Sequence, residues 1–291
     1  MGKYAYYPGC SSESTARDQY MSVKEVAEAL NIELIELKGW TCCGSTPAHH
    51  SGRLLSVALP AANLLMAKKT GLDMVVFCAA CYNRLKVANH EIQTNPEIRK
   101  EIASTLGEDY DGSVKVLHFV EVIIKDIGIK KLKDAFTHSL NGLKISSYYG
   151  CLLVRPHCVT MFDDPENPTL MDKLVTSMGG ESIDWPHKVE CCGGGFALSR
   201  TDIVVDLSDS ILGMAKASGS QCMAVACPMC QINLDMRQPD ILKTKSRDHN
   251  LPVVYITQLL GLCLGIPHKK LGMDKCVISP EPVIESVRMA I

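Results

Sequence analysis

The sequence predicts an α/β protein built from two tandem copies of one small domain, each a mainly parallel sheet flanked by helices, with the copies related by a pseudo-twofold axis. Three observations predict this architecture: two sets of cysteines share one spacing, similar peptides recur beside them, and short apolar runs alternate with helical patterns in both halves. The polar turn sequence HSLNG near residue 140 is typical of a linker. We therefore expect a first domain at 1–140 and a second domain at 141–291.

The cysteines carry the repeat. Each set contains a single cysteine, a cysteine pair 31 or 39 residues further on, and a CxxC motif that follows the pair after 34 residues in both halves. The first set is Cys10, Cys42, Cys43, Cys78 and Cys81, and the second set is Cys151, Cys191, Cys192, Cys227 and Cys230. The peptides YYPGC and SYYGC contain the single cysteines, and CCGS and CCGG contain the pairs. A duplicated domain explains these matches together.

The elements of each copy follow from the apolar patterns. Short β-branched or aromatic runs, and runs that are apolar throughout, indicate four strands per copy, the last of which passes into a helix. Apolar residues at helical spacing indicate the helices. The predicted strands are 4–7, 32–37, 73–77 and the start of 114–123 in the first copy, and 145–149, 181–185, 222–226 and the start of 251–260 in the second. The predicted helices include 15–30, 51–69, 168–178 and 199–217.

Each cysteine group directly follows a predicted strand. Because parallel sheets bind ligands beyond the carboxyl ends of their strands, the five thiols of each set can converge on one site. Five thiols exceed the four protein ligands of a tetrahedral zinc ion or a cubane iron–sulfur cluster. His49 and His50, beside the first pair, are expected to have a loop or supporting role. The remaining cysteines are expected to be small buried hydrophobic residues: Cys158, Cys222, Cys263 and Cys276.

The composition narrows the class of protein. The chain has 291 residues, of which 46% are hydrophobic and 21% charged, and this excludes an intrinsically disordered chain. A net charge of −2 gives no electrostatic reason to expect a nucleic acid or an anionic membrane as a partner. The sequence lacks both a secretory signal and an apolar run of about 18 residues that would span a membrane. We therefore expect a cytoplasmic protein whose clustered thiols are metal ligands or redox groups.

The cysteine pattern resembles that of the paired cysteine-rich CCG domain. Over nearly all of its length, with CCGGG at 191–195 and CPMCQINLDMRQ at 227–238, the chain is similar to the B subunit of heterodisulfide reductase from methanogenic archaea. The resemblance implies that each set holds one noncubane 4Fe-4S cluster and that one thiolate of each set bridges two irons. It also implies an oxidoreductase that reduces the disulfide of coenzyme M and coenzyme B to two thiols, within a multi-subunit complex of methanogenesis.

The resemblance implies partners and substrate contacts as well. Electrons would come from a small iron–sulfur subunit of the C type, fed by a flavin-bearing subunit of the A type and a hydrogenase or formate dehydrogenase. No glycine-rich nucleotide fingerprint occurs, so neither flavin nor NAD is expected on this chain. The substrate would carry sulfonate, phosphate and carboxylate groups, for which Arg155 and His157 are the first candidate contacts. Further candidates are Arg53, Lys188 and Arg200.

Three other functions are alternatives, although the third explains only part of the cysteine pattern. Related domains occur in iron–sulfur subunits of lactate, glycolate and succinate or fumarate oxidoreductases, so the main alternative is an electron-transfer subunit of an organic-acid oxidoreductase. Five thiols could also supply the four ligands of a structural zinc site. A thioredoxin-like protein that uses only the CxxC pairs would leave the adjacent cysteines unexplained. The contents of iron, sulfide and zinc distinguish these functions.

Overall fold

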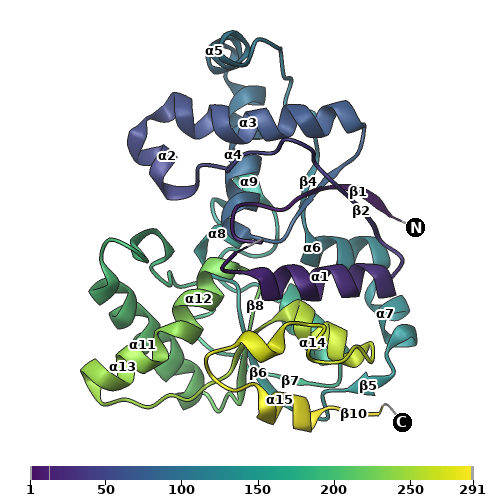
Figure 1. Cartoon of the computed structure of the whole chain (residues 1–291), viewed down its shortest axis with the longest axis vertical. Helices are drawn as coiled ribbons and strands as arrows, with labels where there is room; N and C mark the ends of the chain where they lie inside the picture. Colours follow the sequence, from purple (N-terminus) through teal and green to yellow (C-terminus); the bar gives the residue numbers. More distant parts are fainter. Residues whose placement is uncertain (1, 13, 290–291) are drawn as a thin grey trace.

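The computed structural model describes residues 2–12 and 14–289, and it contains two four-stranded sheets surrounded by helices (Figure 1). The first sheet consists of β1 (Lys3–Tyr7), β2 (Glu33–Glu36), β3 (Met74–Val76) and β4 (Val116–His118). The second consists of β6 (Lys144–Tyr148), β7 (Glu181–Ser182), β8 (Cys222–Val225) and β9 (Val253–Tyr255). The strand orders are β2-β1-β3-β4 and β7-β6-β8-β9, and all pairings within the two sheets are parallel. The predicted α/β fold with two tandem copies is confirmed.

Helices connect the strands in the same order in both halves. The first half contains α1 (Arg17–Ala29), α2 (Ser45–Ser51), α3 (Arg53–Thr70), α4 (Ala79–Thr94), α5 (Pro96–Leu106), α6 (Phe119–Glu121), the π-helical η1 (Val122–Ile127) and α7 (Ile129–Ala135). The second half contains α8 (Cys151–Val154), α9 (His157–Thr160), α10 (Leu170–Ser177), the 3-10 turn η2 (Gly194–Phe196), α11 (Thr201–Ala217), α12 (Pro228–Met236), α13 (Gln238–Lys245), α14 (Ile256–Cys263), the 3-10 turn η3 (Met273–Lys275) and α15 (Glu281–Ser286).

The two sheets share one register as well as one strand order. Tyr7, the last residue of β1, pairs with Val76 of β3, and the equivalent Tyr148 of β6 pairs with Val225 of β8. All residues of β3 and β8 are buried, because helices cover both faces of these central strands. The uniform apolar runs in the sequence predicted this burial. Strand β7 has only two residues and is shorter than the predicted strand 181–185.

The two halves pack through the helices that follow their strands. Helix α4 of the first half contacts α8 and α9 of the second, and α1 contacts α14. Tyr82 on α4 donates a hydrogen bond to the Thr160 carbonyl at 2.9 Å. The hydroxyls of Ser22 on α1 and Thr257 on α14 lie 2.7 Å apart. These contacts hold the two sheets in one fixed arrangement.

The segment around the predicted domain boundary is tied to the C-terminal end of the chain. Strand β5 (His138–Ser139) pairs antiparallel with β10 (Arg288–Met289). A boundary at residue 140 stays a prediction. Among the described residues, no helix combines the length and the apolar character needed to cross a membrane.

Candidate metal centre

The first set of cysteines lies beyond the carboxyl ends of its sheet. Cys10 follows β1 in an exposed loop, and Cys42 and Cys43 follow β2. Cys78 is the N-cap of α4, and Cys81 lies in the first turn of that helix. The sulfurs of Cys43 and Cys81 are 3.3 Å apart. Side-chain hydrogen bonds also join Cys42 to Cys43 and Cys78 to Cys81, so four of the five thiols form a continuous row.

The second set repeats this arrangement. Cys151 begins α8, Cys191 and Cys192 lie in the loop after β7, and Cys227 caps α12 with Cys230 in its first turn. The sulfurs of Cys192 and Cys230 are 3.6 Å apart. Hydrogen bonds join the thiol of Cys151 to that of Cys191 and the thiol of Cys227 to that of Cys230. The structure therefore joins four thiols of the first set in one row and the five thiols of the second set in two neighbouring groups, and their role as metal ligands stays a prediction.

The two sets meet at the interface between the halves. The thiols of Cys78 in the first set and Cys227 in the second lie close enough for each to shift the pKa of the other. Beneath this contact, the Nε2 atom of His118 lies 3.2 Å from the carbonyl oxygens of both Phe77 and Ala226, the residues that precede these cysteines. Thiols that belong to separate repeats in the sequence thus lie side by side at this interface.

The sulfur separations agree with the spacing of thiolates on a shared metal. Two thiolates bound tetrahedrally to one metal at about 2.3 Å are about 3.8 Å apart, close to the 3.3 Å and 3.6 Å of the two cross-loop pairs. Within residues 2–12 and 14–289, no three His, Cys, Asp or Glu side chains are arranged to hold a single metal ion.

Contacts between thiols favour the thiolate form that metals bind. A hydrogen bond from Cys42 holds the pKa of Cys43 well below its ordinary value. The hydrogen bond from Cys151 lowers the pKa of Cys191 to about 6, helped by backbone N–H groups that follow Cys191. A cysteine thiolate is both the metal-binding and the nucleophilic form. The same hydrogen bonds raise the pKa values of the donors, so protons are shared unequally along the row.

Glycine and tyrosine residues at equivalent positions shape both sites. Gly9 and Gly150 have φ angles of +74° and +67°, and a Cβ atom there would lie 3.2 Å from the sulfur of Cys81 and 3.1 Å from that of Cys230. The hydroxyl of Tyr148 donates to the carbonyl that precedes Cys191 at 2.6 Å, and the hydroxyl of the equivalent Tyr7 donates to the carbonyl that precedes Cys42 at 2.8 Å. The peptides YYPGC and SYYGC therefore repeat for a structural reason.

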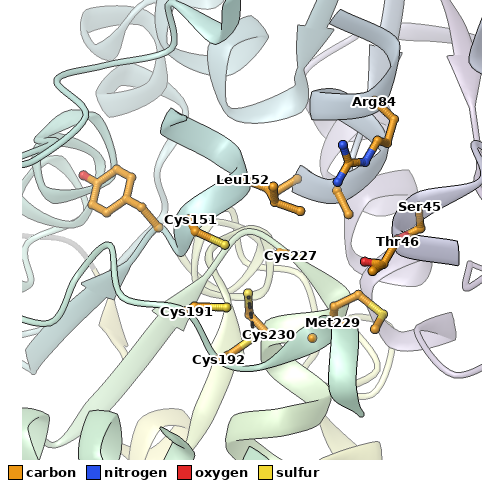
Figure 2. Close-up of a pocket in the computed structure, with 15 residues that line it drawn as sticks. Ser45, Thr46, Arg84, Cys151, Leu152, Cys191, Cys192, Cys227, Met229 and Cys230 are labelled. Atoms are coloured by element: carbon orange, nitrogen blue, oxygen red, sulfur yellow. Dashed lines mark hydrogen bonds between the residues drawn. The ribbon is translucent and has the colours of Figure 1, made fainter. Parts of the chain in front are cut away.

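A cavity of about 200 Å³ lies between the two halves (Figure 2). All five cysteines of the second set line it. The first half contributes Ser45 and Thr46 of α2, with Ala79, Ala80 and Arg84 of α4. Figure 2 shows Arg84, Ser45 and Thr46 across the cavity from Cys151 and Cys191. The cysteines of the first set do not line this cavity, so the two sites differ in their access to it.

The predicted anion contacts lie elsewhere. Arg155 and His157 follow α8 and do not line the cavity. The Arg155 guanidinium pairs with Glu166 at 2.9 Å, and His157 is exposed. Lys188 is buried, and its Nζ atom lies 3.3 Å from Oδ1 of Asp184. Their contact with a substrate stays a prediction.

The other predicted anion contacts, the two histidines and the four remaining cysteines differ in burial and in their partners. Arg53 and Arg200 are exposed and pair with Glu91 and Asp202. His49 contacts the Arg84 guanidinium, and His50 is exposed. Cys222 and Cys263 are buried as predicted, and Cys276 is half-buried. The prediction of a buried residue is wrong for Cys158, which is exposed in α9.

Four residues that line the cavity were not among the predicted site residues: Arg84, Ser45, Thr46 and Met229. Some of them have a signal that could have found them. Ser45 and Thr46 directly follow the CCG peptide at 42–44, so they lie next to the first set in the sequence. Arg84 lies three residues after Cys81, and in the repeat its position is taken by Asn233. Comparison of the two copies beyond the cysteines would have revealed this difference.

Comparisons with known proteins agree with the cysteine pattern. A family model described as a cysteine-rich domain, CCG, matches residues 4–86 and 145–235. The chain is 30% identical to a protein of Archaeoglobus profundus that is named as similar to the B subunit of heterodisulfide reductase, over 99% of this chain and 98% of the relative. It is 29% identical to the B subunit of a ferredoxin- and F420H2-dependent CoB-CoM heterodisulfide reductase of Methanosarcina acetivorans, over 96% of this chain and 94% of the relative.

The chain is also similar to two proteins that are not named as heterodisulfide reductases. The chain is 29% identical to the membrane anchor subunit of the 8-methylmenaquinol:fumarate reductase of Wolinella succinogenes, over 95% of this chain and 97% of the relative. The crystal structure of a hypothetical protein from Helicobacter pylori shares the fold with a TM-score of 0.75 and 11% identity, over 95% of this chain and 52% of that one. These likenesses confirm the resemblance predicted from the sequence: the chain is similar to B subunits of heterodisulfide reductase over almost its whole length. The chain belongs to the family of proteins with paired cysteine-rich CCG domains.

Proposed function

We propose that each cysteine set binds one noncubane 4Fe-4S cluster. Cys10, Cys42, Cys43, Cys78 and Cys81 would hold the first, and Cys151, Cys191, Cys192, Cys227 and Cys230 the second. The observation that carries this proposal is the meeting of two five-thiol sets at the ends of two parallel sheets, with Cys78 and Cys227 in contact. Soft thiolate donors in this number suit iron–sulfur chemistry and exceed the need of a zinc ion.

The proposed reaction is the reduction of the disulfide of coenzyme M and coenzyme B. The sulfur–sulfur bond breaks, two electrons turn its sulfurs into thiolates, and two protons from solvent give two thiols. When bound, the clusters would supply the electrons and soft iron positions that stabilise thiolates. The chain's own residues would bind and shield the substrate: Leu152 and Met229 give the cavity an apolar wall, and Arg84 gives it a cation. The similarity to heterodisulfide reductase B subunits over almost the whole chain supports this reaction.

The electrons would come from other subunits. The named relatives are subunits of larger enzymes, which supports action within a complex. We expect a small iron–sulfur subunit of the C type as the direct donor, and a flavin-bearing subunit of the A type with a hydrogenase or formate dehydrogenase further away. Flavin and NAD would then bind to those partners and not to this chain. Such a complex would act in the cytoplasm, where a reducing environment keeps cysteines available as metal ligands.

One observation favours a second candidate. The likeness to the fumarate reductase anchor subunit covers 95% of this chain at 29% identity, as much as the likeness to heterodisulfide reductase. The chain could therefore relay electrons in an organic-acid oxidoreductase of the fumarate type. In that case the clusters would be reduced and oxidised without a disulfide at the cavity.

Metal analysis tests the proposed clusters. Anaerobically purified protein should contain about eight irons and about eight sulfides per chain with little zinc, as two 4Fe-4S clusters require. Cys191→Ser should lose about half of the iron. The control Cys263→Ser changes a fully buried cysteine outside both sets and should keep all of it. Stoichiometric zinc without iron, or equal iron in the two variants, would overturn the proposal.

Activity separates the two candidate functions. Iron-loaded protein with a reduced viologen dye should oxidise the dye when the mixed disulfide of coenzyme M and coenzyme B is added, and two thiols should appear for each two electrons consumed. The oxidised protein should also give a new EPR signal with coenzyme M thiol. Full iron content with neither response would favour the electron relay.

A further inference from the structure

Arg84 places an unpaired cation in the cavity. It lies on α4 one turn after Cys81 and faces the second set across the cavity (Figure 2). Its Nε atom is buried without a hydrogen-bond partner, and a terminal nitrogen contacts Nε2 of His49. In the part of the chain that the structure describes, no carboxylate lies within ion-pair distance of Arg84. The hydroxyl-bearing Ser45 and Thr46, also from the first half, line the same cavity (Figure 2).

A guanidinium in this position costs free energy unless an anion joins it. Burial lowers the pKa of Arg84 because the buried guanidinium loses solvation, and the thiolate forms of Cys43 and Cys151 offset this only in part. Those two thiols belong to different sets, so Arg84 lies between both. A guanidinium offers five N–H donors in a planar fork that matches the oxygens of a carboxylate, sulfonate or phosphate. The unpaired Nε–H is one of the donors that such a group uses.

The equivalent position in the other half has a different role. Asn233 takes the place of Arg84 in the second copy and is fully buried. Its side-chain amide donates to the carbonyl of Cys192 at 2.9 Å, so it fixes the loop that carries the second pair. The two halves therefore hold their cysteines in equivalent ways, but at this pair of equivalent positions only the first half gives the cavity a cation. A ligand with one anionic end would bind this cavity in a single orientation.

We propose that Arg84, assisted by the hydroxyls of Ser45 and Thr46, binds the oxyanion of a small acidic thiol or disulfide and directs its sulfur toward the second set. This inference rests on the proposed function and specifies the substrate class of that site. The cavity of about 200 Å³ is below the roughly 300–1,000 Å³ of pockets for drug-sized ligands, so the anionic half must be short. A longer second half of the disulfide would extend out of the cavity.

A charge-matched pair of disulfides tests the proposal. The disulfide of 2-mercaptoethanesulfonate carries two anionic ends, and the disulfide of 2-mercaptoethanol has the same carbon chains without charge. Arg84→Met should raise KM for the anionic disulfide 10- to 100-fold with reduced viologen as donor, the range expected for hydrogen bonds to a charged group. KM for the neutral disulfide should stay within twofold. Arg84→Lys should recover part of the affinity, because it keeps the charge without the fork.

Binding measurements distinguish the role of Arg84 from the proposed reaction. Calorimetry of 2-mercaptoethanesulfonate with the oxidised, iron-loaded protein should show a Kd that rises with Arg84→Met. The control Arg99→Met changes an exposed arginine of α5 that pairs with Asp109, and it should leave both affinities unchanged. Equal effects on the charged and neutral ligands, with an altered EPR spectrum, would mean that Arg84 acts on a cluster and would overturn the inference. If the wild type reduces neither disulfide, the proposed reaction fails, while the binding comparison still decides the role of Arg84.

Discussion

Replacing Gly150 with alanine tests whether the second set depends on a close approach between backbone and sulfur. Gly150 has φ 67° and ψ −179°, a region that is essentially restricted to glycine, so alanine should cost about 1–3 kcal/mol in the free energy of unfolding. The new Cβ atom would also lie 3.1 Å from the Cys230 sulfur, which must then shift by a few tenths of an ångström. Metal–ligand distances tolerate only about 0.2 Å. We expect Gly150→Ala to lose about half of the bound iron.

A matched variant separates the backbone cost from the contact. Gly128 has φ 85° and ψ 143°, and a Cβ atom there would meet nothing within 4 Å. Gly128→Ala should therefore lose stability to urea, measured by circular dichroism, while it keeps its iron. Gly9→Ala should affect the first set in the way that Gly150→Ala affects the second, because its Cβ would lie 3.2 Å from the sulfur of Cys81. Equal iron contents in the Gly150 and Gly128 variants would refute this reasoning.

Three further predictions concern single side chains. Tyr148→Phe removes the hydroxyl that donates a hydrogen bond to the carbonyl before Cys191. It should lower the free energy of unfolding by about 1 kcal/mol and speed the removal of iron by a chelator. An unchanged rate of iron release would contradict this prediction. Burial raises the pKa of Asp18 to about 6, so the folded wild type loses stability as the pH rises from about 4 to 6. In urea unfolding, Asp18→Asn should therefore gain about 1 kcal/mol more stability at pH 8 than at pH 5. A gain that does not depend on pH would refute this assignment. Asp209→Ala removes the carboxylate that the buried His249 and Arg247 share, while Lys245 keeps its ion pair with Asp206. The substitution should lower the free energy of unfolding, measured with urea, by about 2 kcal/mol, and a loss below about 0.5 kcal/mol would show that this cluster contributes little.

The repeat predicted the fold because it combines local signals with a geometric rule. The apolar runs at 73–77 and 222–226 are buried central strands, and a CxxC motif after such a strand must begin the next helix at the carboxyl end of the sheet. The 34-residue spacer in both copies spans the helix after the cysteine pair and the following strand. The meeting of the thiols within each set therefore follows from topology.

Contacts between the halves could not be predicted in this way. The approach of Cys78 to Cys227 depends on how α4 packs against α8 and α9, which involves residues as far apart in sequence as Tyr82 and Thr160. Arg155 lies only four residues after Cys151 in the sequence, but its guanidinium pairs with Glu166 and does not line the cavity. Sequence distance from a cysteine is a weak guide to the cavity because side chains on a short helix such as α8 point in several directions.

Differences between the copies indicate how the two halves divide their tasks. The residues that shape the thiol sites are the same in both, as with Gly9 and Gly150. Residues between the sites differ: Arg84 is matched by Asn233, and His118 of β4 occupies the position of Tyr255 of β9. Identical copies would make a symmetric cavity that binds either end of a disulfide equally. A single cation on one side removes that equivalence, so the halves would share the holding of clusters while only the first recognises the charge of the ligand.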